Sequence, residues 1–370
     1  MPEAEVVDGM RGGMEAHCSN CGAKLKYEPG TEHLECPYCG TENEIIPPEH
    51  AIQELDLEKY LHVDKALQEE VEILECSGCG AVNPFEAVKV GKDCVFCGTH
   101  LLVKDATKRH QIKPGALIPF KLKHDRAIVL WKEWTQKLWW APNDIKKMNN
   151  GPDNIKGMYI PYWTFDAQTE SSYTGARGKH RYVPETYQVR EGDRMVTKTR
   201  QKRITDWFPT AGHVSHFFDD VLVLGSESLP RQKALDLDPW NFNEAVPFQE
   251  EYLKGFYVES YSVPLEKGFE RAKSKMDQSI RSLVRSDIGG DEQRIYSVDT
   301  HMDDLTFKLL LLPMYVSAFQ FKGKTYRFLI NGQTGEVQGE RPYSAIKIAL
   351  AIIAGLIIIG LIIWAVQSNQ

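Results

Sequence analysis

One stretch of the sequence is apolar without interruption: Ile348–Val366, nineteen residues of which twelve are Ile, Leu or Val. A helix of this length reaches about 28 Å, close to the thickness of the hydrocarbon core of a bilayer. A buried core helix is the alternative, but core helices rarely lack a polar stripe over such a length. The pattern therefore predicts a transmembrane helix at 345–366, close to the C-terminus.

The charges beside this stretch predict its orientation. Arg341 and Lys347 precede it and no Lys or Arg follows, so the positive-inside rule places the preceding residues in the cytoplasm. Met1–Met10 is acidic and has no apolar run, so we expect neither a signal peptide nor a transit peptide. Ala351 and Gly355 are small residues four positions apart, a spacing that would also allow two copies of the helix to pack closely against each other. We expect a tail-anchored, single-pass membrane protein.

From Ile112 onward, two segments share a helical pattern of apolar residues. Apolar residues follow Pro119 and Pro264 at the same three offsets: Ala127, Trp131 and Leu138 in the first segment, Ala272, Met276 and Leu283 in the second. Each segment then leads into a strand that contains a proline, 159–167 and 312–318. This indicates a duplicated antiparallel α+β domain at 111–343, with halves at about 112–180 and 257–340. Two unrelated helices with similar spacing are the alternative. The last strands, 325–330 and 336–337, flank a turn at 331–335.

All eight cysteines lie in the first hundred residues, in four Cys-x2-Cys pairs. The spacing Cys-x2-Cys-x14-Cys-x2-Cys occurs twice, 58 positions apart, at Cys18, Cys21, Cys36 and Cys39 and again at Cys76, Cys79, Cys94 and Cys97. In a cytoplasmic chain such pairs are typical of metal ligands. Four thiolates leave no open coordination position, so we predict two structural zinc ions in two zinc ribbons, at 15–44 and 73–105.

Other interpretations of the cysteines are weaker. Tetrahedral sulfur sites also suit iron, so a rubredoxin-like site is the main alternative metal centre. A thioredoxin-type redox site would need a surrounding βαβ pattern, which is missing. His17 and His100 flank the ribbons, and with four cysteines at each site we expect them to be solvated neighbours.

Charge is distributed unevenly along the chain. Residues 1–110 carry 10 Lys and Arg against 21 Asp and Glu, a net −11, and the remainder carries 34 against 30, a net +4. An acidic N-terminal part repels phosphate backbones, which argues against general nucleic-acid binding. The segment 45–72 between the ribbons is predicted to be an acidic, partly helical linker, either a spacer or an element that docks onto a partner protein.

Basic residues cluster in the middle of the chain. The segment 172–201 is predicted to be β-rich and basic. Residues 176–203 carry nine Lys and Arg against three acids, and the helix after Pro264 adds six more Lys and Arg. These surfaces would suit anionic lipid. A solvated face balanced by acids elsewhere explains them equally well.

We find no enzyme site in the sequence. Lys322–Thr325 resembles the end of a phosphate loop, but Ala318 stands where the first glycine is needed, and a strand follows. His213 and His216, with Asp219 and Asp220 close behind, lack a third ligand at a known spacing. Ser226 lacks the flanking glycines of a hydrolase elbow. Only the folded structure could show whether two of the acids Asp166, Glu170 and Asp299 come together as a catalytic pair.

Together these stretches resemble a bacterial family of membrane-anchored double zinc-ribbon proteins. The similarity spans nearly the whole chain: the two ribbons, 160–166, 173–178, 218–223, 252–256, 287–294, 331–337 and the terminal helix. Members are often labelled TFIIB-type zinc ribbon protein, primosomal protein N-prime or superfamily II helicase, but this chain has no helicase motor. The resemblance implies an accessory protein of the bacterial cytoplasmic (inner) membrane, associated with stomatin- or flotillin-like (SPFH) proteins and phage-shock (PspA-like) factors.

The leading functional hypothesis is a non-enzymatic membrane adaptor whose ribbons and cytoplasmic domain recruit protein partners. The alternative is a nucleic-acid-associated zinc-ribbon protein linked to replication, and a hydrolase hidden in the central domain is a third interpretation. The chain is expected to contact the lipid bilayer through the helix 348–366. The protein partner is expected to be of the SPFH or phage-shock type.

Overall fold

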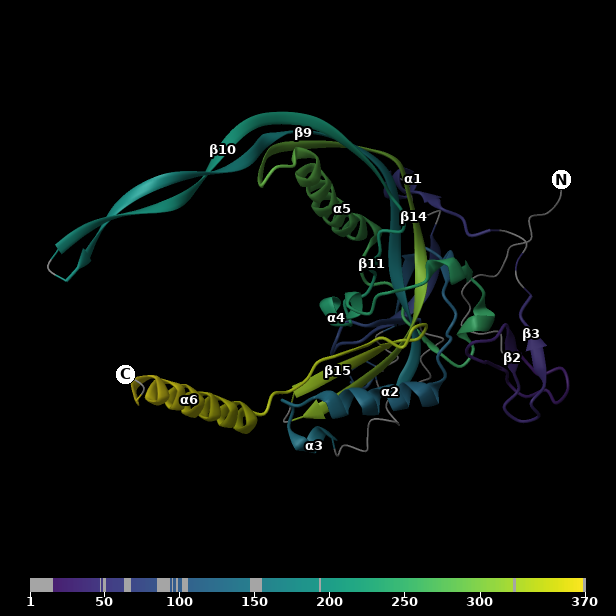
Figure 1. The fold of residues 1–370 in the computed structure, drawn as a ribbon. Helices are drawn as coiled ribbons and strands as arrows, with labels where there is room; N and C mark the ends of the chain where they lie inside the picture. The colour runs from purple at the N-terminus through teal and green to yellow at the C-terminus, as the bar shows by residue number, and fades with distance from the viewer. Residues whose placement is uncertain are drawn as a thin grey trace.

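The computed structural model describes residues 16–46, 48, 51–62, 68–84, 94, 96–97, 99–101, 106–146, 155–192, 194–321 and 324–368. Its centre is a large sheet whose main path runs β10-β9-β14-β15-β16, and each ribbon region contains a three-stranded sheet (Figure 1). Helices pack on the central sheet, so the α+β class expected from the sequence is confirmed.

Two segments of the central domain follow the same order of elements. The first contains β8 (Ala116–Leu117), α2 (His124–Lys137), β9 (Lys156–Glu191) and β10 (Arg194–Phe218). The second contains β13 (Tyr257–Val258), α5 (Leu265–Ile288), β14 (Glu292–Phe321) and β15 (Lys324–Asn331). The long strands β9 and β14 pair antiparallel at the centre of the sheet. This is the arrangement that a duplicated unit would produce.

The short strands make the sheet mixed rather than purely antiparallel. β13 pairs in parallel with β9, and β8 pairs in parallel with β14. Each short strand therefore joins the long strand of the other half, which interlocks the two halves. The remaining short elements are α3 (Asn143–Lys146), β11 (Val223–Leu224), α4 (Arg231–Leu235), η5 (Phe242–Glu244), β12 (Val246–Pro247), η6 (Glu250–Leu253) and β16 (Val337–Gly339).

Helix α5 lies beneath the arc formed by β9 and β10 (Figure 1). Its buried residues recur every three or four positions, which turns one apolar face toward the sheet: Leu265, Gly268, Ala272, Met276, Ile280, Val284 and Ile288. Pro264 precedes the first turn, and Gly289, with a φ of 64°, ends the helix. The predicted positions Ala272 and Met276 are buried, as are Ala127 and Trp131 on α2.

The two ribbons are built into the core of the central domain. Ribbon 1 consists of β1 (Lys26–Tyr27), β2 (His33–Glu35) and β3 (Glu42–Glu44), and ribbon 2 of β5 (Glu69–Glu75), β6 (Val82–Pro84) and β7 (Ala106–Gln111). Tyr27 of ribbon 1 packs with Phe120 and Tyr159 of the domain in one apolar cluster. Phe96 of ribbon 2 packs with Met158 and Leu312 in another. Ribbon 2 also has a small apolar cluster of its own, formed by Val71, Ile73 and Val82, but both ribbons share further apolar clusters with the domain.

The segment between the ribbons also packs on the domain. β4 (Leu55–Asp56) pairs with β14, and α1 (Leu57–His62) follows directly. Leu57 is fully buried in the cluster that contains Trp163 and the buried face of α5. Because this contact fixes the middle of the segment, it is a docked part of the body rather than a loose spacer.

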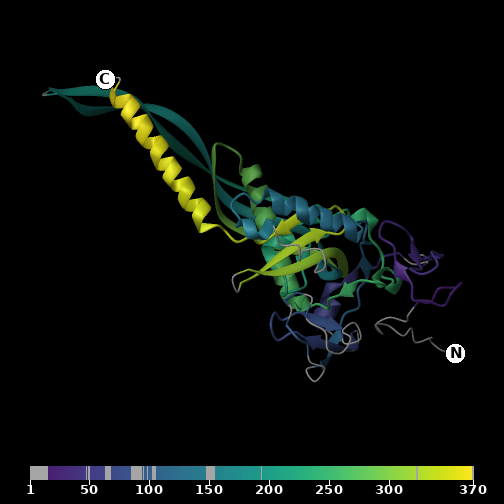
Figure 2. The same ribbon diagram turned by 90° about the horizontal axis from the view of Figure 1, so that it is seen from below.

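Strands β9 and β10 continue beyond the body as an arm. β14 reaches β9 only as far as the pair Glu292 and Gly178, so residues 179–191 and 194–206 pair only with each other among the described residues. At about 3.3 Å per residue this free part is about 40 Å long. The arm and the C-terminal helix project from the same side of the body (Figures 1 and 2).

The C-terminal helix α6 (Ala345–Ser368) leaves the body just after the hairpin of β15 and β16. It is long and apolar enough to cross a membrane, and none of its described residues is buried against the body. Its first turn is fastened to the domain: Lys347 Nζ donates hydrogen bonds of 3.1 Å to the Trp139 carbonyl and of 2.8 Å to the Ala141 carbonyl and Asn143 Oδ1. The helix is therefore not a loose tail at its point of departure.

Candidate metal centres

In ribbon 1 the sequence builds two turns that face one another. The amides of Cys18 and Cys36 donate to the carbonyls of Ala23 and Thr41, and those of Gly22 and Gly40 donate to the carbonyls of Cys18 and Cys36. Both glycines have a positive φ, of 71° and 68°, which L side chains rarely adopt. The turns bring the sulfurs of Cys18, Cys21, Cys36 and Cys39 within 4.8 Å of one another.

Ribbon 2 repeats this construction. The amides of Cys76 and Cys94 donate to the carbonyls of Ala81 and Thr99, both at 2.8 Å. The sulfurs of Cys76, Cys79, Cys94 and Cys97 again lie within 4.8 Å of one another. In both ribbons the shortest sulfur–sulfur distances join corresponding cysteines: 3.6 and 3.5 Å in ribbon 1, 3.5 and 3.6 Å in ribbon 2. The predicted ligand sets therefore come together as two similar clusters.

These distances fit a tetrahedral metal site. A tetrahedron with metal–sulfur distances of about 2.3 Å has edges of about 3.8 Å, close to the separations in both clusters. All eight thiols are free of disulfides. Two zinc ions could therefore be held, each by four sulfurs, with no coordination position left for substrate.

Hydrogen bonds between the clustered sulfurs lower the pKa of some thiols and raise that of others, so only part of each cluster favours the thiolate form that metal binding requires. A hydrogen bond with the Thr41 hydroxyl, 3.1 Å from Cys39 Sγ, lowers the pKa of the Cys39 thiol to about 6. In ribbon 2 a hydrogen bond with Cys79 lowers the pKa of Cys94 to about 5. Burial raises the pKa of Cys76, so a metal ion would have to offset that cost.

The histidines beside the ribbons are not in the ligand clusters. His17 Nδ1 lies 3.0 Å from the Gly22 carbonyl oxygen, and neither His17 nor His100 belongs to a group of converging ligands among the described residues. His213 and His216 are three apart on β10, so their side chains point to opposite faces of the strand. A shared metal ion between them is therefore excluded.

A third group of converging acids lies in the central domain. Carboxylate oxygens of Glu54, Asp166 and Asp220 lie within 4.8 Å of one another. The ammonium of Lys308 sits among them, 2.5 Å from Glu54 and 2.6 Å from Asp220. Burial acts to lower the pKa of Lys308, but its hydrogen bonds to Asp220 and Glu54 outweigh this and raise it. This group thus has a cation of its own and is not a further metal centre.

Sequence reasoning named two members of this cluster, Asp166 and Asp220, but did not bring them together. Asp166 was one of three acids considered for pairing, whereas Glu170 and Asp299 lie opposite Ser215 and Ser172 on neighbouring strands. Glu54 and Lys308 are 254 positions apart, and nothing in their local sequence links them. A lysine inside the apolar strand 305–312 was the available signal, because a buried lysine requires a carboxylate partner.

Ser226 also has hydrogen-bond partners, and they form a buried group. Its hydroxyl lies 2.7 Å from that of Ser228 and donates a hydrogen bond of 2.9 Å to Glu259, and all three residues are buried. Burial raises the pKa of the Glu259 carboxyl to about 8. With no histidine in this cluster, it lacks the base of a serine hydrolase.

Comparison with known proteins gives one informative match. "Uncharacterized protein YdjG" of Bacillus subtilis (strain 168) is 27% identical over 335 residues, which is 90% of this chain and 91% of that protein. No family model and no solved structure matches the chain. The chain is thus similar over nearly its whole length to a bacterial protein whose name states no activity.

Proposed function

We propose that this protein is a non-enzymatic adaptor held at the bacterial inner membrane by α6. Its body stays on the cytoplasmic side, as Arg341 and Lys347, just before the apolar part of α6, favour. The two zinc ions stiffen the body, and the arm of β9 and β10 recruits a protein partner. The partner class that we propose is a membrane-stress protein of the SPFH or PspA-like type.

The arm is the observation that carries this proposal. It adds nothing to the apolar clusters of the body, so folding does not explain its length. Large apolar side chains stand in solvent on and near it, among them Tyr182 at 65% and Met195 at 62% exposure. β10 is the edge strand of the sheet, and an edge strand can add a strand from a partner through its free backbone groups.

The base of the arm is fixed rather than hinged. Tyr173 donates a hydrogen bond to Asp287 of α5, and Arg177 donates to the Ile288 carbonyl at 2.5 Å. His180 pairs with Glu292 at 2.7 Å, and the guanidinium of Arg294 stacks on Trp207 at 3.8 Å. These contacts direct the arm away from the body, as an element that reaches a partner at a distance requires.

The charges of the arm argue against the nucleic-acid alternative. Arg181 pairs with Asp206 at 2.5 Å, and Arg200 and Lys202 pair with Glu185 at 2.7 and 2.5 Å. Lys198 pairs with Glu191. These pairs occupy four of the eight Lys and Arg of residues 179–206, so fewer cations are left to release counterions from a phosphate backbone, which weakens binding to it.

Removal of the arm tests the adaptor function. His180 and Thr205 are directly opposite each other, so residues 181–204 can be replaced by Asn-Gly, which suits a two-residue hairpin turn. We expect this variant to keep both zinc ions and its membrane attachment, and to lose the SPFH or PspA-like protein that mild cross-linking captures with the full chain in native membranes. Capture of the same partner by both proteins, or of none by the full chain, would refute the proposal.

A further inference from the structure

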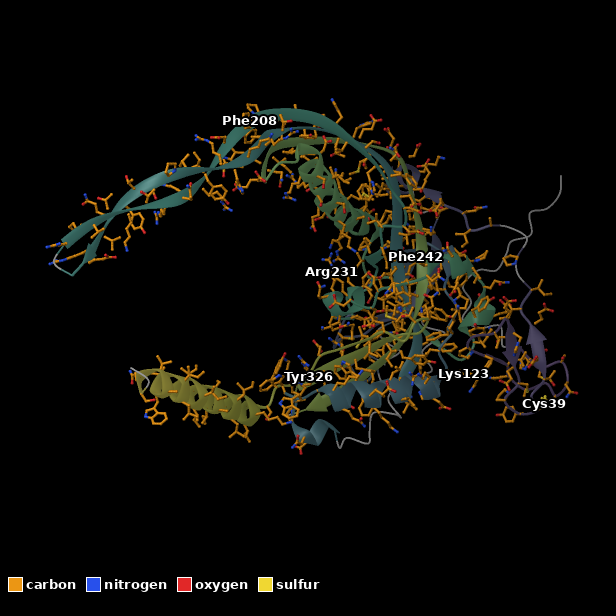
Figure 3. The ribbon with its side chains drawn as sticks, in the orientation of Figure 1. Cys39, Lys123, Phe208, Arg231, Phe242 and Tyr326 are labelled. Carbon is orange, nitrogen blue, oxygen red and sulfur yellow. The ribbon has the colours of Figure 1, made fainter. Side chains whose placement is uncertain are left out.

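A basic cavity opens at the base of α6. Its volume is about 480 Å³, and its walls come from α2, α4, β15, β16 and the segment that leads into α6. Tyr326 of β15, on its wall, lies at the end of the sheet from which α6 departs (Figure 3). Three cations line it, Lys233, Lys324 and Arg341, against one carboxylate, Glu340, which gives a net charge of +3 − 1 = +2.

Within the part of the chain that the structure describes, no carboxylate lies as close to the cations of this cavity as those that pair with the cations of the arm. Lys233 lies 3.8 Å from Asp236, and its contact with Gln338 is 3.5 Å long. Lys324 and Arg341 lie over the rings of Tyr326 and Tyr343, at 5.6 and 5.4 Å from the ring centres. The Glu340 carboxylate is engaged by the backbone N–H of Arg327 at 3.0 Å. The cavity therefore carries a net positive charge, which would attract an anion.

An apolar groove adjoins this cavity. It has a volume of about 410 Å³ and runs along the first turns of α6, between Trp140 and Tyr343 on one side and Ile348, Ala351 and Ile352 on the other. Tyr343 lines both spaces, so the basic cavity and the apolar groove lie next to each other. A ligand that fills both has an anionic head and a hydrocarbon chain.

Aromatic residues place the site at the level of lipid headgroups. Trp139 is 73% exposed beside the carbonyls that hold Lys347, and Tyr343 is 60% exposed. Trp364 is exposed near the other end of α6. Trp and Tyr at both ends of a membrane-spanning helix mark the two interfaces of a bilayer. The cavity is therefore at the depth where phosphates of the cytoplasmic leaflet lie.

We propose that this site binds one anionic glycerophospholipid. The phosphate contacts Lys233, Lys324 and Arg341, and an acyl chain lies in the groove along Ile348 and Ile352. This proposal rests on the insertion of α6 that the proposed function includes. The proposal extends that function by one bound anionic lipid. Basic pockets beside membrane helices on the cytoplasmic side are suited to anionic headgroups.

Lipid retention by the purified full chain tests the site. Protein exchanged into detergent with dioleoylphosphatidylglycerol or dioleoylphosphatidylcholine is examined by native mass spectrometry, and affinity is measured by titration. We expect one phosphatidylglycerol per chain, and an affinity about tenfold lower in the double variant K324Q/R341Q, a change of about 1.4 kcal/mol. The matched control R200Q/K202Q removes two cations from the arm and should bind normally. A351W, which fills the groove, should also weaken binding.

Three outcomes would overturn the proposal. They are equal retention of phosphatidylcholine, unchanged affinity in K324Q/R341Q, and displacement of the lipid by inorganic phosphate alone, which would make this a free-phosphate site. Resistance of α6 to alkaline extraction from native membranes is measured in parallel. If α6 stays in the membrane and K324Q/R341Q binds the lipid with unchanged affinity, only the proposed lipid site is refuted. If α6 is extracted from the membrane, the proposed membrane adaptor is refuted as well.

Discussion

The indole of Trp163 on β9 packs directly against Gly268 on α5. A Cβ at position 268 would lie 2.8 Å from Trp163 Cδ1, which is closer than real contacts allow. Trp163 cannot easily withdraw, because it is fully buried and its Nε1 donates a hydrogen bond of 2.9 Å to the Val263 carbonyl. The glycine thus sets the distance between the helix and the sheet.

We therefore expect G268A to destabilise the domain by about 1–3 kcal/mol, the usual cost of overpacking, despite the higher helix propensity of alanine. Thermal unfolding of the full chain in detergent measures this. G360A is the matched control, because its glycine is also helical and has nothing within 4 Å of the added Cβ. Equal melting temperatures for G268A and the wild type would contradict the packing described here.

The first ribbon gives a prediction about metal content. C18S should bind one zinc ion instead of two, because a site with three sulfurs holds zinc less firmly. Since Cys18 shares an apolar cluster with Phe120 and Tyr159, the melting temperature of the central domain should fall as well. Elemental analysis and calorimetry check both effects, with H17A as a control that should keep two zinc ions. Iron in the fresh protein would refute the zinc assignment.

Lys308 should be essential for stability. K308M leaves the carboxylates of Glu54 and Asp220 without their cation, which we expect to cost about 3–5 kcal/mol. Burial raises the pKa of Glu54, and Lys308 opposes that shift. Without Lys308 the folded state should hold a proton on Glu54 to higher pH than the unfolded state does, so the variant should gain stability as the pH falls. Urea unfolding at several pH values, with the exposed Lys179→Met as control, measures this. A K308M variant as stable as the wild type would be incompatible with a buried ion pair.

Glu259 should make stability depend on pH near neutrality. Burial raises its pKa to about 8 in the folded state, so from about pH 4.5 to pH 8 the folded state binds more protons than the unfolded state. Its contribution to stability is therefore complete at low pH and is lost as the pH rises, by up to about 1.4 kcal/mol per unit. E259Q should flatten the stability curve between about pH 6 and about pH 8, whereas E227Q, at an exposed position, should leave it unchanged. If the stability of E259Q and of the wild type changed with pH to the same extent, this would argue against a raised pKa of Glu259.

Spacing in the sequence predicted the features that depend on near neighbours. The cysteine ligands follow from two turns of Cys-x2-Cys, and the buried face of α5 follows from apolar residues at helical intervals. The strand, turn and returning strand at 325–337 were predicted in the same way, and Asn331 fixes that turn by accepting the amide hydrogens of Gln333 and Thr334. Local geometry alone determines such features.

Features that depend on distant contacts were not predicted. The packing of Tyr27 against Tyr252 joins residues 225 positions apart in the sequence, and no periodicity records it. The length of the arm was missed for another reason. The segment 172–201 was expected to be β-rich, but a two-stranded ribbon exposed on both faces has no apolar alternation to mark where the sheet ends and the arm begins.

The departure of the arm and α6 from the same side of the body has a consequence for how a partner is found. Once α6 crosses a bilayer, the charged arm with its free backbone edges cannot enter the hydrocarbon, so the angle between α6 and the arm has to open relative to that in Figures 1 and 2, and the arm then remains in the water beside the membrane. An arm held there samples a thin layer over the membrane rather than the volume of the cell. A partner that is also bound to the membrane would meet it by diffusion in two dimensions, at a raised effective concentration. Even a weak contact at the arm could then be occupied.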